Sequence, residues 1–148
     1  MNILELTSKV TKRLIRTGSR LFDSLLFPGR AIVRRLRARR VPVILQLTDV
    51  ECGAACLAML LNYHGRKTSL SECRDYCSVG RDGITAQTIA RAARHFGLRV
   101  RAYSLELADF KYVPLPAIVH WTFNHFVVVE RWSQTGAEII DPGLGRDT

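Results

Sequence analysis

A single cysteine marks the point where a loop passes into the most apolar helix-forming stretch of the sequence. Residues 48–51 precede Cys52, and the chain from there to His64 is rich in alanine, leucine and methionine, with Gly65 as its stop signal. A thiol at the amino end of a helix meets unpaired N–H groups and the positive end of the helix dipole. Both favour the thiolate over the thiol. Cys52 is therefore the predicted nucleophile, and Gly53 beside it predicts room for a substrate backbone.

A thiolate nucleophile needs a base and a group that orients that base. His125 lies at the start of one predicted strand, and Asp141 lies at the end of the next. In two antiparallel strands joined by a hairpin these positions are neighbours, so we expect the two side chains to face each other. His120 is the competing base, but no acidic residue stands at the matching offset. Gln46, six residues before Cys52, is placed to donate to an oxyanion beside the Cys52 N–H group.

The elements that must position these residues change type once along the chain. Helix signals come first, and runs of β-branched and aromatic residues separated by turn signals follow them. This order predicts an α+β domain whose N-terminal helices pack on a mainly antiparallel sheet. The expected helices cover residues 52–64, 70–77 and 85–95, and the expected strands cover residues 98–105, 117–122, 125–132 and 137–140.

The positive charge of the chain is confined to its first 40 residues. Residues 1–40 contain eleven Lys or Arg and two Asp or Glu, whereas residues 41–148 contain eleven of each, so the net charge of +9 comes from the first segment alone. The high pI therefore does not indicate a nucleic-acid partner. The division predicts a basic arm over residues 1–40 and one domain over residues 41–148.

The arm carries apolar residues at spacings of mostly three, four or seven, which predicts an amphipathic helix over residues 1–27. These residues are Ile3, Leu6, Val10, Leu14, Leu21 and Leu25. Two interpretations stay open for the arm. It is either a solvated, partly disordered tail, or a segment that lies on an anionic membrane surface or against a partner.

The four cysteines do not predict disulfides. Residues 1–27 lack the continuous apolar core of a secretory signal, so we expect a reducing compartment and free thiols. The pairs Cys52–Cys56 and Cys73–Cys77 have the spacing of one helical face, which keeps a zinc site open as an alternative. Structural zinc cysteines usually have the shorter C-x2-C spacing, and we expect neither a metal nor another cofactor.

One uncharged stretch has nearly the length of a membrane span. Residues 112–129 contain no Asp, Glu, Lys or Arg, and a transmembrane helix needs about 20 apolar residues. The stretch also contains prolines and histidines, and its apolar residues cluster in two β-type runs. It predicts two buried strands joined by a turn.

The ordered set Gln46, Cys52, His125 and Asp141 is similar to that of papain-like peptidases. Several longer strings are similar to one family in particular: ECGAACLAM at 51–59, PAIVHW at 116–121, NHFVV at 124–128 and DPG at 141–143. On these motifs, over residues 41–146, the chain resembles the double-glycine leader peptidases, the papain-like domains fused to the N-terminus of bacteriocin-exporting ABC transporters. The strings around the cysteine and the histidine most resemble the branch that handles nitrile-hydratase-like leader peptides of ribosomally made, modified natural products.

The resemblance implies a papain-like fold and a cysteine endopeptidase that removes a leader peptide after a Gly-Gly, Gly-Ala or Gly-Ser pair, coupled to export. By the same resemblance Cys52 is the nucleophile, His125 the general base and then acid, Asp141 the orienter and Gln46 the oxyanion donor. The implied partners are a bacteriocin-type precursor with a helical leader and the membrane and ATP-binding domains of a transporter. The implied location is the cytoplasmic side of the bacterial inner membrane, and the chain is either an excised domain or a stand-alone peptidase.

Trp121, Phe123 and Asn124 adjoin His125 and are candidates to line a cleft too narrow for residues larger than glycine. Core packing is an equal alternative for the two aromatic residues. Two other classes of function also stay open. One is a domain that binds the leader without cutting it, and the other is a different thiol acyl-transfer enzyme on the same scaffold, such as a deamidase or transglutaminase.

Overall fold

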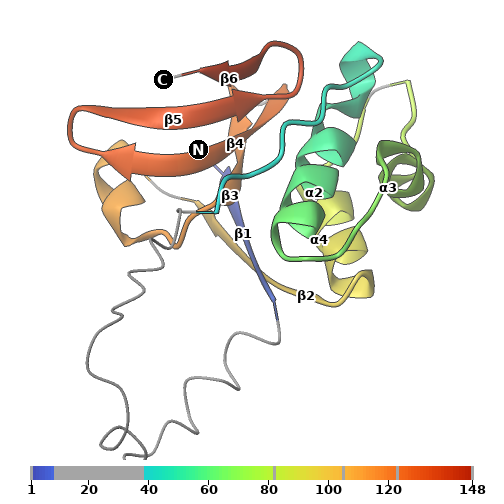
Figure 1. Ribbon diagram of the computed structural model, residues 1–148, viewed down its shortest axis with the longest axis horizontal. Coiled ribbons are helices and arrows are strands. Elements are labelled where there is room, and N and C mark those ends of the chain that lie inside the picture. The colour runs from blue at the N-terminus through green and yellow to red at the C-terminus, as the bar shows by residue number, and fades with distance from the viewer. Residues whose placement is uncertain (1, 9–38, 82, 105, 123, 148) are drawn as a thin grey trace, which may run out of the picture.

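The computed structural model describes residues 2–8, 39–81, 83–104, 106–122 and 124–147. In this part of the chain three α-helices pack on a six-stranded sheet in which every neighbouring pair of strands is antiparallel (Figure 1). The strand order is β2-β1-β3-β4-β5-β6. The predicted α+β class, with helices on a mainly antiparallel sheet, is confirmed.

The helices begin and end close to their predicted boundaries. They are α2 (Cys52–Tyr63), α3 (Leu70–Cys77) and α4 (Ala86–His95). Ser69 and Thr85 cap α3 and α4, each accepting a hydrogen bond from an N–H group in the first turn. Two short 3-10 helices, η1 (Asp49–Glu51) and η2 (Leu107–Tyr112), complete the helical elements of the described residues.

The last four strands of the chain form an antiparallel meander, in which each strand pairs with the next. The strands after the helices are β2 (Leu98–Ser104), β3 (Ala117–Trp121), β4 (His125–Ser133), β5 (Gly136–Asp141) and β6 (Gly145–Asp147). The uncharged stretch 112–129 forms β3 and the start of β4, as predicted. Among the described residues no helix combines the length and the apolar character that crossing a bilayer requires.

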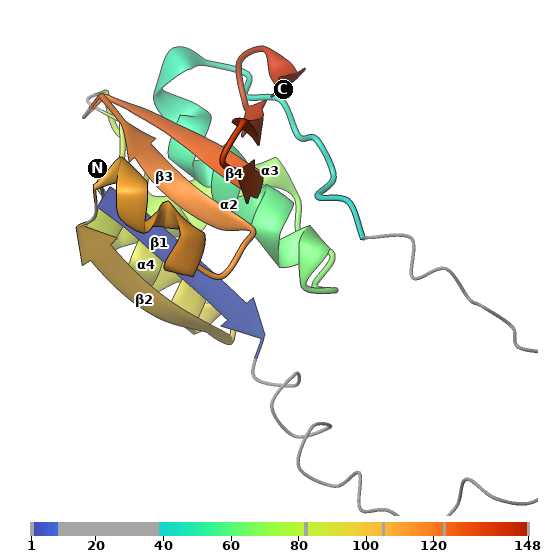
Figure 2. The same ribbon diagram turned by 90° about the vertical axis from the view of Figure 1, so that its left-hand side faces the viewer.

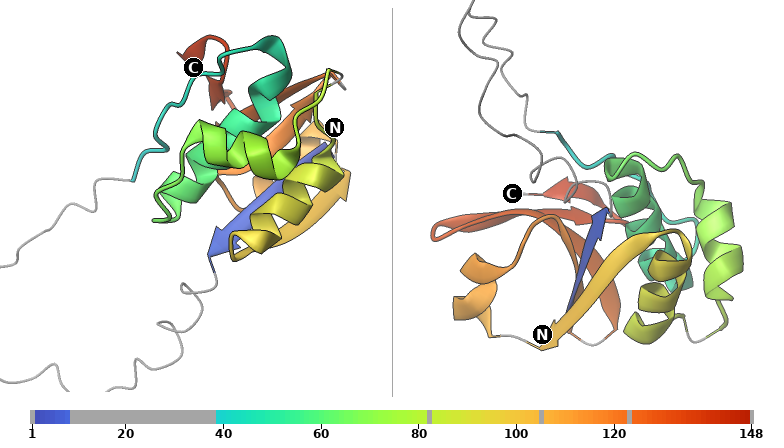
Figure 3. Two further views of the ribbon diagram at one scale, coloured as in Figure 1. Left: turned by 90° about the vertical axis from the view of Figure 1, so that its right-hand side faces the viewer. Right: turned by 90° about the horizontal axis from the view of Figure 1, so that it is seen from below.

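Each face of the sheet carries its own apolar core. The three helices cover one face, where ten consecutive residues of α2, Cys52 to Leu61, are buried. The opposite face holds a smaller cluster around Phe110, Val119 and Val127, and η2 lies over it (Figures 2 and 3). Because both faces are covered, strands in the middle of the sheet bury side chains of both alternating sets.

Residues Asn2–Ser8 form β1, a strand in the interior of the sheet, where the sequence predicted part of a basic amphipathic helix. β1 pairs with β2 on one side and with β3 on the other. Ile3, Leu4 and Leu6 are at most 3% exposed, with Ile3 in one core and the two leucines in the other. The prediction was wrong for these residues because the spacing of Ile3 and Leu6 also fits a helix. A strand that is buried on both faces needs only apolar residues and shows no distinctive spacing of its own. The rest of the predicted arm, 9–38, lies outside the described residues.

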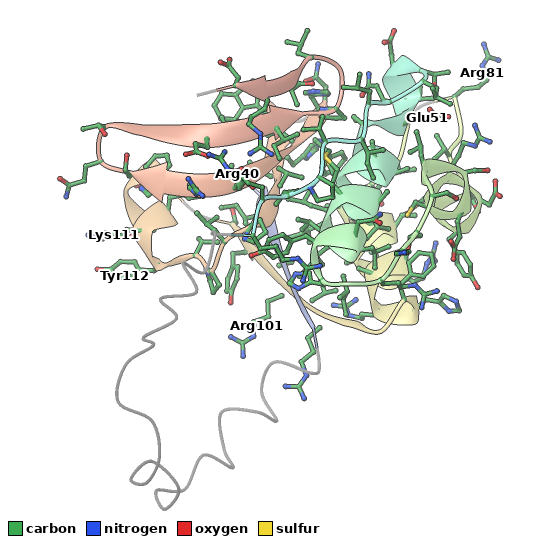
Figure 4. All side chains as sticks on the ribbon, in the orientation of Figure 1. Arg40, Glu51, Arg81, Arg101, Lys111 and Tyr112 are labelled. Atoms are coloured by element: carbon green, nitrogen blue, oxygen red, sulfur yellow. The ribbon has the colours of Figure 1, made fainter. Side chains whose placement is uncertain are left out.

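A buried carboxylate fixes the place where the chain re-enters the domain. Glu130 on β4 has a side chain that is 4% exposed, and it accepts hydrogen bonds from the Val41 N–H group, from Arg40 and from Arg146. Arg146 also donates to the Val41 carbonyl oxygen over 2.8 Å. Figure 4 shows Arg40 where this extended segment passes the sheet. The contacts set the course of residues 41–46, which lead to the candidate site.

The position of β1 can be tested by replacing Leu6 with aspartate. Leu6→Asp places a charge at a site that is 1% exposed, and we expect the free energy of unfolding to fall by about 3–5 kcal/mol. Leu144→Asp is the matched control, because Leu144 is 90% exposed and its replacement should change stability by less than about 0.5 kcal/mol. Urea unfolding followed by circular dichroism measures both. Equal stabilities would show that residue 6 lies outside the core.

Candidate active site

Cys52 begins α2 and lines an open cavity. The thiol residue is 6% exposed and follows directly on η1. The cavity has a volume of about 700 Å³, and its walls come from η1, the first residues of α2, the loop before α4, and β3 and β4. Its lining includes Asp49, Arg81, Gly83, His120, Asn124 and Phe126.

His125 and Asp141 lie side by side at the same edge of the β4–β5 hairpin. His125 Nε2 and Asp141 Oδ2 are 3.0 Å apart, and both side chains are partly buried. The other carboxylate oxygen accepts a hydrogen bond of 2.7 Å from the Gly143 N–H group, so the turn after β5 fixes the carboxylate. The predicted juxtaposition of His125 and Asp141 is confirmed. Since Nε2 is held by the carboxylate, Nδ1 is the ring nitrogen that remains for a reacting group.

Gln46 lies against the turn that holds Asp141. Its N–H group donates to the Pro142 carbonyl oxygen over 2.8 Å. A Cβ atom added to Gly143 would lie 3.7 Å from Gln46 Nε2 and 3.2 Å from Asp141 Oδ1, which places the two side chains around one glycine. Gln46 Oε1 is buried and has no hydrogen-bond partner among the described residues. The backbone of Gln46 is therefore held at the turn after β5, and its side-chain oxygen is enclosed there.

The first turn of α2 packs on the start of β4, the strand that His125 begins. Cys56, one turn after Cys52, donates from its Sγ to the Phe126 carbonyl oxygen over 3.3 Å. Burial raises the pKa of the Cys56 thiol well above its usual value, and the nearby Cys52 and Asp141 groups raise it further. Cys56 thus lies within electrostatic reach of both Cys52 and Asp141, and it remains a thiol.

Of the candidate substrate-binding residues, the structure places one in the cavity lining and another outside it. Asn124, in the turn between β3 and β4, lines the cavity. Trp121 pairs with His125 across the strands and is 47% exposed, but it is not part of the described cavity lining. Phe123 lies outside the described residues. His120 also lines the cavity, and its ring stacks on Phe126 with centroids 4.4 Å apart.

Gly53 makes room for the protein core. A Cβ atom at this position would lie 2.7 Å from the Cδ1 atoms of both Ile84 and Ile89. The sequence predicted that the glycine lets a substrate backbone approach, and that prediction was wrong. The missing side chain instead lets α2 approach the start of α4 and the loop before it.

Gly53→Ala is expected to destabilise the fold by about 1–3 kcal/mol, because the new methyl group overpacks the contact with the two isoleucines. Adding Ile84→Ala and Ile89→Val removes Ile84 Cγ1 and both Cδ1 atoms, the three atoms within 2.8 Å of the new methyl group, and should recover part of the loss. Thermal unfolding measures stability, and peptide cleavage by the same variants measures KM. An unchanged stability combined with a raised KM would restore the substrate-approach interpretation.

The remaining cysteines are buried free thiols of the helices. All four cysteines are free and buried. Burial raises the pKa of Cys73 to about 12 and that of Cys77 to about 11. No group of three or more His, Cys, Asp and Glu residues within the described ranges is arranged to hold a metal ion.

Sequence reasoning missed Glu51 as a residue of the site. Its carboxylate is 3% exposed and accepts hydrogen bonds from the N–H groups of Leu47 and Thr48 and from the Arg74 guanidinium. Figure 4 shows Glu51 at the start of α2. The available signal was an acidic residue directly before the cysteine that begins an apolar helix. A carboxylate buried at such a position is stable only when it is paired, so the sequence could have predicted a partner for Glu51.

A helix that begins with a cysteine, packed on an antiparallel sheet that carries a histidine–carboxylate pair, is the architecture of papain-like peptidases. The chain belongs to the Peptidase C39 family, whose model matches residues 40–148. It is 38% identical over 107 residues to the colicin V secretion/processing ATP-binding protein CvaB of Escherichia coli. The aligned region covers 72% of this chain and 15% of that protein. It is 27% identical over 106 residues to the transport/processing ATP-binding protein ComA of Streptococcus pneumoniae. The match thus spans about 15% of the length of each of these two curated relatives.

Two solved structures share this architecture. One is a double glycine motif protease from an AMS/PCAT transporter in complex with the leader peptide, with 42% sequence identity and a TM-score of 0.70 over 74% of this chain and 79% of that chain. The other is the peptidase domain of Streptococcus ComA, with 24% identity and a TM-score of 0.67 over 73% of this chain and 85% of that chain, which supports the fold alone. The family match begins at residue 40, so β1 lies outside it.

Proposed function

We propose that this chain is a cysteine endopeptidase that removes the leader of a bacteriocin-type precursor peptide by cutting after a double-glycine motif, coupled to export by an ABC transporter. The observation that carries the proposal is the 3.0 Å contact between His125 and Asp141 at the sheet edge on which the Cys52 end of α2 packs. The relatives that are processing and transport proteins, and the neighbour that binds a leader peptide, support the substrate class.

In the proposed reaction His125 Nδ1 accepts the Cys52 proton, and the thiolate attacks the carbonyl carbon of the second glycine. The Cys52 N–H group and the Gln46 amide donate to the oxyanion that forms. The imidazolium then protonates the leaving amine, and a water molecule, activated by the same histidine, hydrolyses the thioester. Asp141 holds the ring in one tautomer and stabilises its charged form. As proposed, the reaction uses side chains of the chain and no metal or cofactor.

Substrate selection is proposed to come from two surfaces. The cleft beside Cys52, with Asn124 on its wall and Trp121 near its histidine edge, accepts Gly-Gly or Gly-Ala and excludes larger side chains. Glycine itself adds little binding energy, so affinity has to come from a groove for the apolar residues of a helical leader. The precursor is the proposed partner together with transporter domains, at the cytoplasmic side of the bacterial inner membrane. Contact of residues 9–38 with the membrane surface belongs to the same proposal.

Cys52→Ala tests the nucleophile. We expect cleavage of a double-glycine precursor to fall by at least about 10⁴-fold, because no thiolate remains, while the Kd for the leader stays within about threefold of the wild-type value. Asp141→Asn should lower kcat by about 10²–10⁴-fold. Cys77→Ala is the control, since this buried cysteine lies on α3 outside the site. Mass spectrometry follows cleavage, and calorimetry measures affinity.

Two results would contradict the proposal in different ways. Cleavage by Cys52→Ala at a comparable rate would remove the mechanism. Leader binding by the wild-type chain without any cleavage would favour the non-catalytic alternative, and transfer of the acyl group to an added amine in preference to water would favour another acyl-transfer enzyme.

The narrow cleft can be tested on the substrate. Replacing the second glycine of the precursor motif by valine should lower kcat/KM by at least about 10³-fold, because the branched side chain keeps the carbonyl from the thiolate. Replacement by alanine should cost far less. A peptide series cleaved by the same enzyme preparation gives the comparison, and equal rates for glycine and valine would show that exclusion by size does not select the substrate.

A further inference from the structure

The carboxylate of Glu51, immediately before Cys52, is nearly inaccessible and has no role in the proposed reaction. Its Oε2 atom accepts hydrogen bonds from the N–H groups of Leu47, over 3.0 Å, and Thr48, over 3.2 Å. Its Oε1 atom accepts a hydrogen bond of 3.1 Å from Arg74 Nη1 on α3. A buried charge with this many donors is held in one place, and it holds those donors in turn.

These bonds set the shape of the oxyanion loop, which we define as residues 46–52. Gln46 at one end is tied to Pro142 through its N–H group, and Cys52 at the other end begins α2. Glu51 binds the two amides that directly follow Gln46. Glu51 therefore constrains the backbone between Gln46 and Cys52, and with it the spacing between the glutamine and the Cys52 N–H group. Oxyanion donors act only within about 2.7–3.1 Å of the oxyanion, so a displaced loop loses catalysis before it loses binding.

Glu51 directly precedes Cys52 in the chain, and a negative charge near a nucleophilic thiol disfavours the thiolate. Burial by itself would raise the pKa of the Glu51 carboxyl, but the hydrogen bonds from Arg74, Leu47 and Thr48 and the charge of Arg74 together lower it. Glu51 is therefore ionised at neutral pH. Arg74 is the cation that binds it, on a side chain that is 41% exposed.

We propose that Glu51 and Arg74 are a positioning pair, in which Glu51 sets the geometry of the oxyanion loop and Arg74 balances its charge so that Cys52 is reactive at neutral pH. The catalytic half rests on the proposed function, whereas the electrostatic half concerns the thiol alone. Asp49, Arg81 and His120 line the cavity together with Cys52, Cys56 lies one turn along α2, and the His125–Asp141 pair lies at the end of the β4–β5 hairpin. They are the same in every variant below, so differences between variants isolate the pair.

The experiment compares Arg74→Met, Arg74→Lys, Glu51→Gln and the double variant Glu51→Gln/Arg74→Met. The alkylation rate of Cys52 by iodoacetamide is measured against pH, with fragment-level mass spectrometry to separate Cys52 from Cys56. We expect Arg74→Met to raise the apparent pKa of the Cys52 thiol by about one unit, because the carboxylate loses its counter-charge. Arg74→Lys should restore most of the shift. The double variant, which lacks both charges, should return to the wild-type pKa.

Cleavage of a double-glycine peptide by the same variants tests the geometric half. Glu51→Gln and the double variant should lose at least about tenfold in kcat with KM within about twofold of wild type, since the loop acts on the transition state. A rise in KM with unchanged kcat would overturn the positioning role. Should Glu51→Gln not fold, as judged by circular dichroism, the two Arg74 variants carry the test, because their exposed side chain can be replaced without opening the core.

Arg131→Met is the matched control. Arg131 Nη1 lies 3.1 Å from Glu138 Oε1 and its side chain is 43% exposed, so the variant removes an equally exposed arginine from an equally close ion pair away from the site. An alkylation pKa for Arg74→Met equal to that of Arg131→Met overturns the proposal. A shifted pKa in a chain that never cleaves the peptide would retain the electrostatic half and reject the proposed function instead.

Discussion

The contact between the first turn of α2 and the start of β4 is the constraint on which the candidate site depends. Ten consecutive buried residues make α2 the centre of the larger core, so the helix cannot shift along the sheet without exposing apolar surface. The Cys56 thiol adds a directional bond to the Phe126 carbonyl oxygen at this contact. Because Cys52 is one turn earlier and His125 is one residue earlier, the packing of the core also decides how the two proposed catalytic groups meet.

Two buried glutamates hold the chain on its way to this contact. Glu130 binds the backbone at Val41, and Glu51 binds it at Leu47 and Thr48, so that the extended segment between them is fixed at both ends. Burying a carboxylate costs several kcal/mol unless donors replace its water, and each glutamate has backbone N–H groups and arginine as donors. The segment lies outside the helices and strands, and these polar ties replace the regular hydrogen bonds that it lacks.

Local signals in the sequence were enough to predict the helices and the His125–Asp141 pair. The features that were predicted wrongly depend on contacts between residues far apart in the chain. Capping residues such as Ser69 act within one turn, and a hairpin brings strand ends together by geometry alone, so neither needs knowledge of distant residues. β1 could not be predicted in the same way, because its partners β2 and β3 lie about 100 residues further along the chain. Gly53 was misread for a similar reason, since the atoms that exclude its side chain belong to Ile84 and Ile89.

The structure also gives a physical reason why, of two cysteines on one helix, the proposed nucleophile is the first. Cys56 is fully buried, its thiol donates to a backbone oxygen, and both burial and the neighbouring Cys52 and Asp141 groups oppose its ionisation. Cys52 lies at the beginning of the helix and borders the cavity, where a substrate can reach it. A negative charge formed at Cys52 during the proposed reaction would oppose ionisation of Cys56 further. The same helix thereby carries the proposed nucleophile at its first residue and a packing sulfur one turn further in.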